Sequence, residues 1–273
     1  MVKLIASDMD GTLLDPAKKI PPDFVSVLKN LKKRNIKFVV ASGRSYSALE
    51  VLFKNIGNDI IYICDNGAFV VNDNKISNIS VIPHKKIAEI INVLSRLNGV
   101  FPVLCGKNGI YIPSDYDDEF IKEFDSYYVS PILCDDMYAV KDDIFKIAVY
   151  DRLNPQKNSF PELNKIFSKK LSIQISGNVW MDIMNKGVNK GAALAEIKKK
   201  FGITTDQTMA FGDFYNDISL LSEAKYSYVM ANANDDMKQY GNFTAEGNSE
   251  YGVTKAISAY LAKHPVNPVN PVI

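Results

Sequence analysis

The sequence predicts an α/β protein with a doubly wound, parallel, Rossmann-like core and an inserted α/β cap domain. Short apolar runs of strand length alternate with segments of helical periodicity near both ends of the chain, the pattern of a parallel sheet covered by helices. Small polar residues and glycines follow several of these strands directly, and such turns carry ligand-binding residues in open parallel sheets. The middle of the chain has strands and helices of its own, enough for a second domain.

The chain up to residue 82 is expected to form the first part of the core. Leu4 to Ser7 is a short run of apolar and small residues, typical of a buried strand. Asp65-Asn66-Gly67 is a strong turn signal after a later strand. The expected elements are a strand over 4–7, a helix over 24–31, a strand over 36–41, a helix over 45–54, a strand over 60–64, and an antiparallel pair over 69–71 and 79–82.

The pattern of apolar segments changes after residue 82, and residues 83–186 are expected to form the inserted cap. Apolar positions at helical spacing open this segment, and shorter apolar runs with glycine-containing turns follow. The expected elements are a helix over 87–97, strands over 101–105 and 110–113, a helix over 117–127, a strand over 144–150, a helix over 161–167, and a hairpin over 171–176 and 179–184.

The chain is expected to return to the core at residue 187, so that residues 1–82 and 187–273 form one discontinuous domain. Lys190-Gly191 opens a helix that Gly202 ends. A strand over 208–211, a short helix around 220–221, a strand over 226–230 and a helix over 253–261 follow. The tail, 264–273, repeats Pro-Val-Asn without a core-forming pattern and is expected to be extended or frayed.

Composition and charge exclude several classes of function. The 273 residues are 47% hydrophobic and 23% charged, with a formal net charge of +1, which is ordinary for a globular protein. This balance gives no electrostatic reason to expect a nucleic-acid partner or an acidic membrane surface. No obligate protein partner is indicated, and no apolar run reaches membrane-spanning length. The start of the chain also lacks a signal-peptide pattern, so we expect a cytoplasmic protein.

Cysteine and histidine usage narrows the chemistry further. Cys64, Cys105 and Cys134 are an odd number without a Cys-x-x-Cys pair. They are expected to be buried thiols in a reducing compartment, and not a disulfide framework or a zinc site. With only His84 and His264 in the chain, a histidine-based hydrolase or a zinc enzyme is disfavoured.

The first strand ends in two carboxylates, Asp8 and Asp10, separated by one residue. In an extended strand they share a face, and like charges this close are costly without a counter-ion. A divalent cation removes that cost, and Mg²⁺ is the usual partner of clustered hard oxygen ligands. The ordinary alternative is a strand end followed by an acidic turn, a frequent use of an Asp-Gly pair such as Asp10-Gly11.

Three further groups of polar residues lie at strand or helix ends. Ser42 follows the second strand and precedes a helix, which places a hydroxyl and backbone N–H groups where an anion can bind. Lys190 opens a helix, and Asp213 with Asn216 and Asp217 ends a late strand. Taken singly, each has an ordinary structural alternative: a helix cap, a solvated lysine and an acidic loop. Together they are expected to converge on one edge of the parallel sheet.

The four motifs resemble those of the haloacid dehalogenase superfamily of phosphatases. They read Asp-x-Asp-Gly-Thr at 8–12, Ser-Gly-Arg at 42–44, Lys-Gly-x-Ala-Leu at 190–194 and Gly-Asp-x-x-Asn-Asp at 212–217. More narrowly, the chain resembles the Cof-type sugar-phosphatase group, whose large α/β cap is inserted between the second and third motifs. The resemblance covers nearly the whole chain except the tail. Leu220 and Ala231 depart from the group's usual methionine and glycine, away from the chemistry.

The resemblance implies a role for each motif residue. Asp8 attacks phosphorus and forms an aspartyl-phosphate, while Asp10 is the general acid and then the general base. Mg²⁺ is held by the Asp8 carboxylate, the Asp10 backbone carbonyl and Asp213. The groups implied to bind phosphoryl oxygens are Ser42, Lys190 and the backbone N–H groups of Met9 and Gly43.

Four residues keep less definite roles. Asn216 is implied to contact phosphate or to support the metal site, and Asp217 to fix Lys190 or the water ligands of the metal. Arg44 either contacts substrate or forms an ion pair within the core. Trp180 either stacks on a sugar face or packs in the cap, and packing is the commoner use of a single strand aromatic.

The sequence therefore predicts a Mg²⁺-dependent phosphatase of small phosphorylated metabolites, above all sugar phosphates. A phosphomutase or phosphotransferase with the same nucleophile is one alternative. It is disfavoured because only the length of a strand–helix–strand unit separates Asp10 from Ser42, which leaves no room for the helical cap of those enzymes. A non-enzymatic phospho-accepting signalling domain is the other alternative. Such domains have a single acceptor aspartate in a much shorter chain, without a partner such as Asp10 or a cap.

Overall fold

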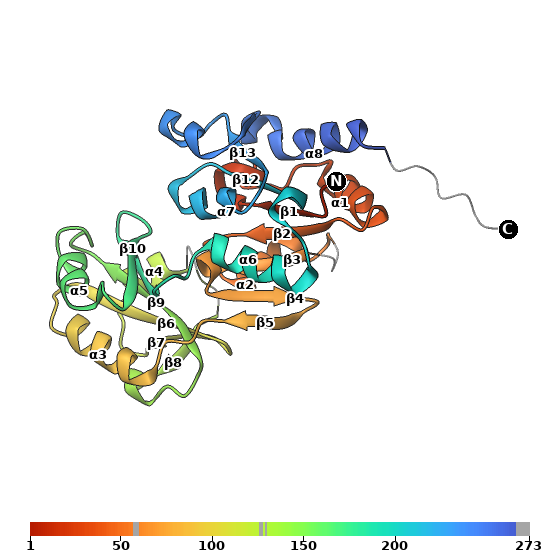
Figure 1. Cartoon of the computed structure of the whole chain (residues 1–273). Helices are drawn as coiled ribbons and strands as arrows, with labels where there is room; N and C mark the ends of the chain where they lie inside the picture. Colours follow the sequence, from red (N-terminus) through yellow and green to blue (C-terminus); the bar gives the residue numbers. More distant parts are fainter. Residues whose placement is uncertain (57–59, 126–127, 129, 266–273) are drawn as a thin grey trace.

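The computed structural model describes residues 1–56, 60–125, 128 and 130–265, which form two β-sheets with helices packed on them (Figure 1). The larger sheet has eight strands in the order β14-β13-β12-β1-β2-β3-β4-β5, and the smaller has six in the order β10-β11-β9-β6-β7-β8. The smaller sheet lies wholly between β5 and the helix α6 in the sequence. Of the predicted tail, 264–273, the part at 266–273 lies outside the described residues.

The eight-stranded sheet is parallel except at one edge. β1 lies in its interior and pairs in parallel with β2 and β12, while β4 and β5 are antiparallel. All four residues of β1 are buried, as expected for a strand covered on both faces. The strands are β1 (Leu4–Ser7), β2 (Lys37–Ala41), β3 (Ile60–Cys64), β4 (Phe69–Asn72), β5 (Lys75–Ile79), β12 (Thr208–Gly212), β13 (Tyr226–Met230) and β14 (Phe243–Ala245).

Helices cover both faces of this sheet, which confirms the doubly wound α/β class. On one face Phe24, Phe53 and Ile257 pack in the same buried cluster as Ile5 of β1. On the other face, helix residues such as Leu194 pack with the alternate strand residues. The first face carries α1 (Phe24–Lys33), α2 (Tyr46–Phe53) and α8 (Gly252–Lys263), and the second α6 (Lys190–Phe201) and α7 (Ile218–Ser222) (Figure 1).

The six-stranded sheet is mostly antiparallel and has its own hydrophobic cluster. Helices α3 and α5 cover one of its faces, and α4 contributes Phe120 and Phe124 to the other. The elements are α3 (His84–Leu94), β6 (Val100–Gly106), β7 (Ile110–Pro113), α4 (Asp118–Phe124), β8 (Ile132–Cys134), β9 (Ile144–Asp151), α5 (Ser159–Phe167), β10 (Leu171–Ile175) and β11 (Trp180–Asn185).

The two chain crossings between the sheets lie side by side. Asn185 Nδ2 donates hydrogen bonds to the Val81 carbonyl at 2.8 Å and to the Ser80 hydroxyl at 3.1 Å. Phe69 of the larger sheet also stacks on Phe145 of the smaller one, with ring centroids 5.1 Å apart. The proposed domain limits at 82/83 and 186/187 fall between β5 and α3 and between β11 and α6, and they stay a prediction.

Several predicted elements need correction. The strand expected over 79–82 lies instead at Lys75–Ile79, and Ile82 is a buried crossing residue whose N–H donates to the Ile144 carbonyl at 2.7 Å. The first cap helix ends at Leu94 and not at 97. The strands β8 and β14 were not expected, because each has only three residues and is largely exposed. Residues 126–127 of the predicted acidic helix lie outside the described residues.

Two further expectations concern the burial of the cysteines and the absence of a membrane-spanning segment. Cys64 and Cys105 are buried thiols, but Cys134 is only partly buried, so that expectation is wrong for Cys134. Among the described residues, no helix combines the length and the apolar character needed to cross a membrane.

Candidate active site

The site is built at the carboxyl edge of the eight-stranded sheet. Asp8 directly follows β1, Ser42 follows β2, and Asp213 follows β12. The Asp8 N–H donates to the Phe211 carbonyl at 3.0 Å, which continues the β1–β12 hydrogen bonding to the last residue before the site. Because β1, β2 and β12 are neighbouring parallel strands, their ends place these side chains on one edge.

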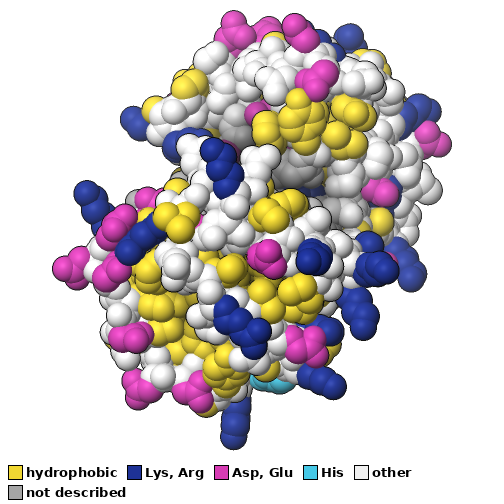
Figure 2. All heavy atoms as spheres, turned by 90° about the vertical axis from the view of Figure 1, so that its left-hand side faces the viewer, with side chains coloured by type: hydrophobic (Ala, Val, Ile, Leu, Met, Phe, Trp, Pro, Cys, Tyr) yellow, Lys and Arg dark blue, Asp and Glu magenta, His cyan; other side chains and the backbone are white. Residues whose placement is uncertain are grey.

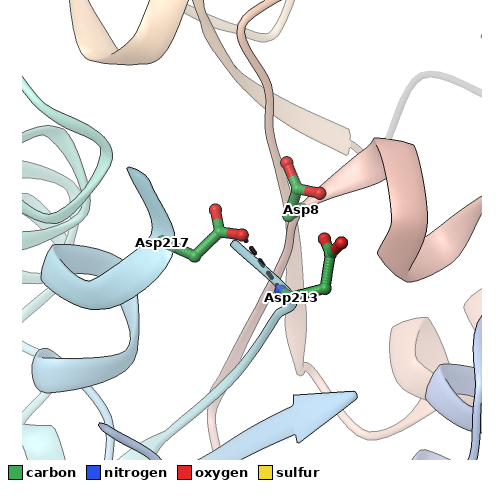
Figure 3. A group of neighbouring side chains, drawn as sticks. All are labelled: Asp8, Asp213 and Asp217. Atoms are coloured by element: carbon green, nitrogen blue, oxygen red, sulfur yellow. Dashed lines mark hydrogen bonds between the residues drawn. The ribbon is translucent and has the colours of Figure 1, made fainter. Parts of the chain in front are cut away.

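Three carboxylates meet at this edge. Asp8, Asp213 and Asp217 each offer an oxygen within 4.8 Å of the others, and their side chains point toward a common space in Figure 3. Asp8 and Asp217 are buried, and Asp213 is partly buried. Such a group of hard oxygen donors has the chemistry of a magnesium site. The residues present therefore fit the ion that the motifs imply.

Hydrogen bonds fix two of these carboxylates. The hydroxyl of Thr12 donates to Asp213 Oδ1 at 2.8 Å. Asp217 Oδ2 accepts from the backbone N–H groups of Asp213 at 3.1 Å and Phe214 at 3.2 Å. Gly11 has φ +85°, and a Cβ there would lie 2.2 Å from Asp213 Oδ2. Only glycine suits this position, because a side chain would be strained and would displace the carboxylate.

Lys190 is the cation of this cluster. Its side chain is 1% exposed, and Nζ lies 2.5 Å from Asp8 Oδ1 and 2.7 Å from Asp217 Oδ1. It is the first residue of α6, and Asn189 caps the helix by accepting the Ala192 N–H. A lysine at a helix N-terminus opposes the helix dipole. Its position is therefore stabilised by the two aspartates and not by the helix.

The cluster is short of positive charge. Burial raises the pKa of Asp8 to about 8, repulsion from Asp217 adds to this effect, and Lys190 opposes it. Burial likewise raises the pKa of Asp213. Three carboxylates against one ammonium leave two negative charges when all are ionised. A divalent cation supplies that charge.

Asp10 lies at the solvent side of the cluster, with its side chain 35% exposed. Arg44 grips it through two hydrogen bonds, from Nε at 2.7 Å and from Nη2 at 2.6 Å, and Lys18 Nζ donates at 2.7 Å. Burial raises the pKa of Asp10, but the hydrogen bonds from Arg44 and Lys18 outweigh burial and hold the pKa below its usual value. Of the two alternatives for Arg44, the structure shows the ion pair.

The serine loop lies between these groups. Ser42 is buried, and its Oγ accepts the Arg44 N–H at 3.1 Å. Gly43 adjoins Asn66, whose Oδ1 accepts a hydrogen bond from Asn216 Nδ2 at 3.1 Å. Met9 is buried directly after Asp8. The structure thus brings Ser42, Gly43 and Asn216 together through Asn66.

Thr12, Lys18 and Asn66 contact site residues but were not expected to do so. Thr12 belongs to the first motif, and Asn66 lies in the turn after the third strand, where Asn66-Gly67-Ala68 also supports the family resemblance. Lys18 lies in a loop without any motif. Trp180 is 5% exposed and packs on Tyr150, so the structure shows packing and not an open stacking face.

Comparison with known proteins identifies the class of enzyme to which this fold and site belong. A family model for haloacid dehalogenase-like hydrolases matches residues 5–257. The chain is 31% identical to the 5-amino-6-(5-phospho-D-ribitylamino)uracil phosphatase of Escherichia coli (strain K12), over 96% of this chain and 97% of that protein. The chain belongs to the haloacid dehalogenase-like hydrolase family.

Solved structures agree with this assignment. A Streptococcus mutans UA159 protein superposes with a TM-score of 0.85 at 31% identity, covering 96% of this chain and 100% of that one. A haloacid dehalogenase subclass IIB sugar phosphatase shares the fold, with a TM-score of 0.76 at 24% identity over 95% of this chain and 99% of that one. The resemblance to the Cof-type group is confirmed, and the protein is a phosphoric monoester hydrolase.

Proposed function

We propose that the protein is a Mg²⁺-dependent phosphatase of small phosphorylated metabolites, in particular sugar phosphates, and that Asp8 is its nucleophile. The observation that carries this proposal is the meeting of Asp8, Asp213 and Asp217 around buried Lys190 at one edge of the sheet. A carboxylate beside a lysine ammonium, in a cluster that can bind a divalent cation, is suited to attack a phosphoryl group and to hold it covalently.

The reaction has two displacements. In the first, an Asp8 oxygen attacks phosphorus, the P–O ester bond breaks, and the leaving alkoxide takes a proton from Asp10. In the second, water attacks the phosphorus of the aspartyl-phosphate and gives its proton to Asp10. The bond between phosphorus and Asp8 breaks, and inorganic phosphate is released. The second displacement thus restores the Asp8 carboxylate and the Asp10 proton that the first one consumed.

Asp10 must carry a proton in the first displacement, and its ion pairs with Arg44 and Lys18 oppose this. An incoming phosphoryl group offers both cations another anionic partner. We therefore assign Arg44 and Lys18 a second role, in which substrate binding draws them away from Asp10 and raises its pKa. Arg44 would then have both of the roles that the sequence left open: an ion pair with Asp10 before substrate binds, and a contact to the substrate afterwards.

The other site residues bind the phosphoryl group or the metal. Asp8 and Asp213, with the Asp10 carbonyl, would hold Mg²⁺, which offsets the repulsion between the anionic nucleophile and its anionic substrate. Asp217 has both oxygens engaged, by Lys190 and by backbone N–H groups, so we assign it to position Lys190. The groups assigned to the phosphoryl oxygens are Ser42, Lys190, Asn216 and the N–H groups of Met9 and Gly43.

A cavity beside the site suits a small, hydroxylated leaving group. It has a volume of about 340 Å³ and is lined by side chains that include Asn66, Gln174, Asn189, Lys190 and Asn216. Gln174 belongs to β10 of the smaller sheet, whereas the others come from the core. Amide groups can both donate to and accept from hydroxyl groups. The E. coli relative is named for a phosphorylated ribityl compound, which is also rich in hydroxyl groups.

The face of the molecule in Figure 2 gives no support for a polyanionic partner. On the face in Figure 2, lysine and arginine side chains are interspersed with aspartate and glutamate. With a net charge of +1 for the whole chain, a small phosphorylated ligand is the partner that the site favours.

The direct test is to incubate the protein and Mg²⁺ with a panel of phosphorylated metabolites and to measure the release of inorganic phosphate. We expect sugar and polyol phosphates to be cleaved faster than phosphoproteins. Acid-quenched protein should carry phosphate on Asp8 during turnover. Transfer of phosphate to a second sugar would instead indicate a phosphotransferase, and stable labelling without turnover would indicate a phospho-accepting domain.

A further inference from the structure

A second buried charge cluster lies between the two sheets. Lys146 of β9 is 3% exposed, and its Nζ is 2.5 Å from Asp65 Oδ1, whose side chain is 1% exposed. Asp182 of β11 is the more distant carboxylate, with its Oδ1 4.0 Å from Lys146 Nζ. The ion pair therefore joins the six-stranded sheet to Asp65, the residue that directly follows β3 of the core.

Aromatic side chains seal this cluster from water. Lys146 Nζ lies 5.5 Å from the centroid of the Tyr128 ring, and the neighbouring residue, Phe145, stacks on Phe69 of the core. A lysine removed from water in this way costs stability unless its partners stay in place. Burial would lower the pKa of Lys146, but Asp65 and the other acidic groups around it, Asp182 among them, together outweigh burial and keep the pKa well above its usual value. Lys146 therefore stays a cation, and the core residue Asp65 contributes most to this among its neighbours.

Asp65 begins a turn of unusual backbone conformation. Asp65 has φ +48°, Asn66 φ +54° and Gly67 φ +104°. Two successive residues with side chains in the left-handed region persist only where the surroundings hold them. A Cβ on Gly67 would lie 2.3 Å from the Asn189 carbonyl oxygen, so the turn packs against the residue that precedes Lys190.

The same turn is bonded to the catalytic loop. The Asp65 N–H donates to the Arg44 carbonyl at 3.0 Å, and the Asn66 N–H donates to the Ser42 carbonyl at 2.9 Å. Arg44 in turn grips Asp10. A continuous set of contacts thus runs from Lys146, through the turn, to the loop that holds the proposed phosphate ligand and the partner of the general acid.

We infer that Lys146 is a positioning residue: its ion pair with Asp65 holds the 65–67 turn, and through it Ser42 and Arg44, in the geometry needed for turnover. This rests on the proposed function for its kinetic consequence. Two other roles are possible for a buried lysine at this place, a purely structural ion pair and a direct contact to the leaving group. Each predicts a different set of kinetic constants.

The experiment compares Lys146→Met, Asp65→Asn and the double variant with a matched control. Lys198 of α6 is also a buried lysine, 6% exposed, but its Nζ lies 2.6 Å from Glu223, which follows α7, outside the set of contacts described above. Lys198→Met should lower the melting temperature and leave kcat unchanged. Asp65→Asn keeps the shape of the side chain, so it carries the test if Lys146→Met does not fold.

We expect Lys146→Met and Asp65→Asn each to lower kcat about tenfold or more, with KM changed less than about threefold. The loss should be the same for p-nitrophenyl phosphate and for a sugar phosphate, because positioning acts on the phosphoryl group that both share. The double variant should lose no more than either single variant, since both changes break one ion pair.

Hydrogen exchange gives a readout that does not depend on activity. The amides of Asp65 and Asn66 should exchange at least about tenfold faster in Lys146→Met than in the wild type, and unchanged in Lys198→Met. This measurement tests the hold on the turn even if the wild type hydrolyses no phosphate ester, a result that would count against the proposed function alone.

Four results would overturn the inference. A rise in KM for the sugar phosphate with normal turnover of p-nitrophenyl phosphate would make Lys146 a substrate contact. A lower melting temperature with unchanged kcat, as in Lys198→Met, would make the ion pair merely structural. Additive losses in the double variant, or unchanged exchange of the turn amides, would show that Lys146 does not act through Asp65.

Discussion

Two buried lysines in this protein each lie near two aspartates, but the surroundings of the two clusters differ. Lys190 lies between Asp8 and Asp217 at the edge of the core sheet, and Lys146 lies between Asp65 and Asp182 where the sheets meet. The first cluster includes a further carboxylate, Asp213, and adjoins a cavity. The second is buried, with the Tyr128 ring beside Lys146. The same residue types therefore serve an open site in one place and a closed contact in the other.

The count of charges accounts for the difference. At Lys190, three carboxylates face one ammonium, an excess of two negative charges when all are ionised. At Lys146, two carboxylates face one ammonium, and the excess is one. An excess of two beside a cavity calls for a divalent cation. Burial raises the pKa of Asp65, as it raises those of Asp8 and Asp213 in the first cluster, so the excess of charge and the adjoining cavity are what distinguish the two clusters.

The largest expected difference comes from replacing one aspartate of each cluster by asparagine. Asp8→Asn should lower kcat by about 10⁴-fold, because the amide is not a nucleophile. Asp182→Asn should change kcat less than about threefold, since Asp182 Oδ1 lies 4.0 Å from Lys146 Nζ, beyond hydrogen-bond distance. Hydrolysis of p-nitrophenyl phosphate measures both. Comparable losses in the two variants would contradict the distinction between the clusters.

Metal binding should separate the clusters by a thermodynamic measurement. Mg²⁺ should raise the melting temperature of the wild type by a few degrees, because the ion binds the folded state. EDTA should reverse this rise and stop turnover, and Ca²⁺ should restore turnover poorly because its looser coordination misplaces the nucleophile. Asp213→Asn should lose the Mg²⁺-dependent rise, whereas Asp65→Asn should keep it. A rise retained in Asp213→Asn would place the metal elsewhere.

The smallest expected effect is on thiol labelling, which should measure how well the second cluster is protected from solvent. Burial raises the pKa of Cys105 to about 12 and raises that of Cys64 well above its usual value. At pH 8 both should stay protonated and react with iodoacetamide more slowly than the partly exposed Cys134. Lys146→Met should increase labelling of Cys64 and Cys105 severalfold, as mass spectrometry of peptides would show. Unchanged labelling would mean that the contact stays sealed without its cation.

The sequence was sufficient for features that local patterns encode. Asp8, Ser42 and Asp213 each follow a short apolar run, so their place at one sheet edge follows from the rule for parallel strands. Edge strand β5 was placed too late in the chain because Ile82 resembles a strand residue, whereas it is buried where the chain crosses between the sheets. Apolar character shows that a residue is buried, but not by which element.

Other features arise from contacts that no local pattern contains. Lys146 and Asp65 are far apart in sequence, and neither stands out from the many lysines and aspartates of the chain. Lys18 reaches Asp10 from a loop without regular structure. Such pairs depend on how the two sheets and their loops meet, and tertiary packing decides that. A single sequence therefore predicts the reactive groups better than the residues that position them.

The two crossings, joined by Asn185 and the backbone at Val81, also bear on how such a protein could diversify. Because the polypeptide leaves and re-enters the core at one point, the intervening segment is a unit with adjacent ends. A genetic replacement between these two points would exchange the Gln174 side of the cavity while leaving the order of the parallel strands unchanged. New substrates could then be acquired by recombination of one continuous coding segment, provided that the incoming segment supplied a partner for Asp65.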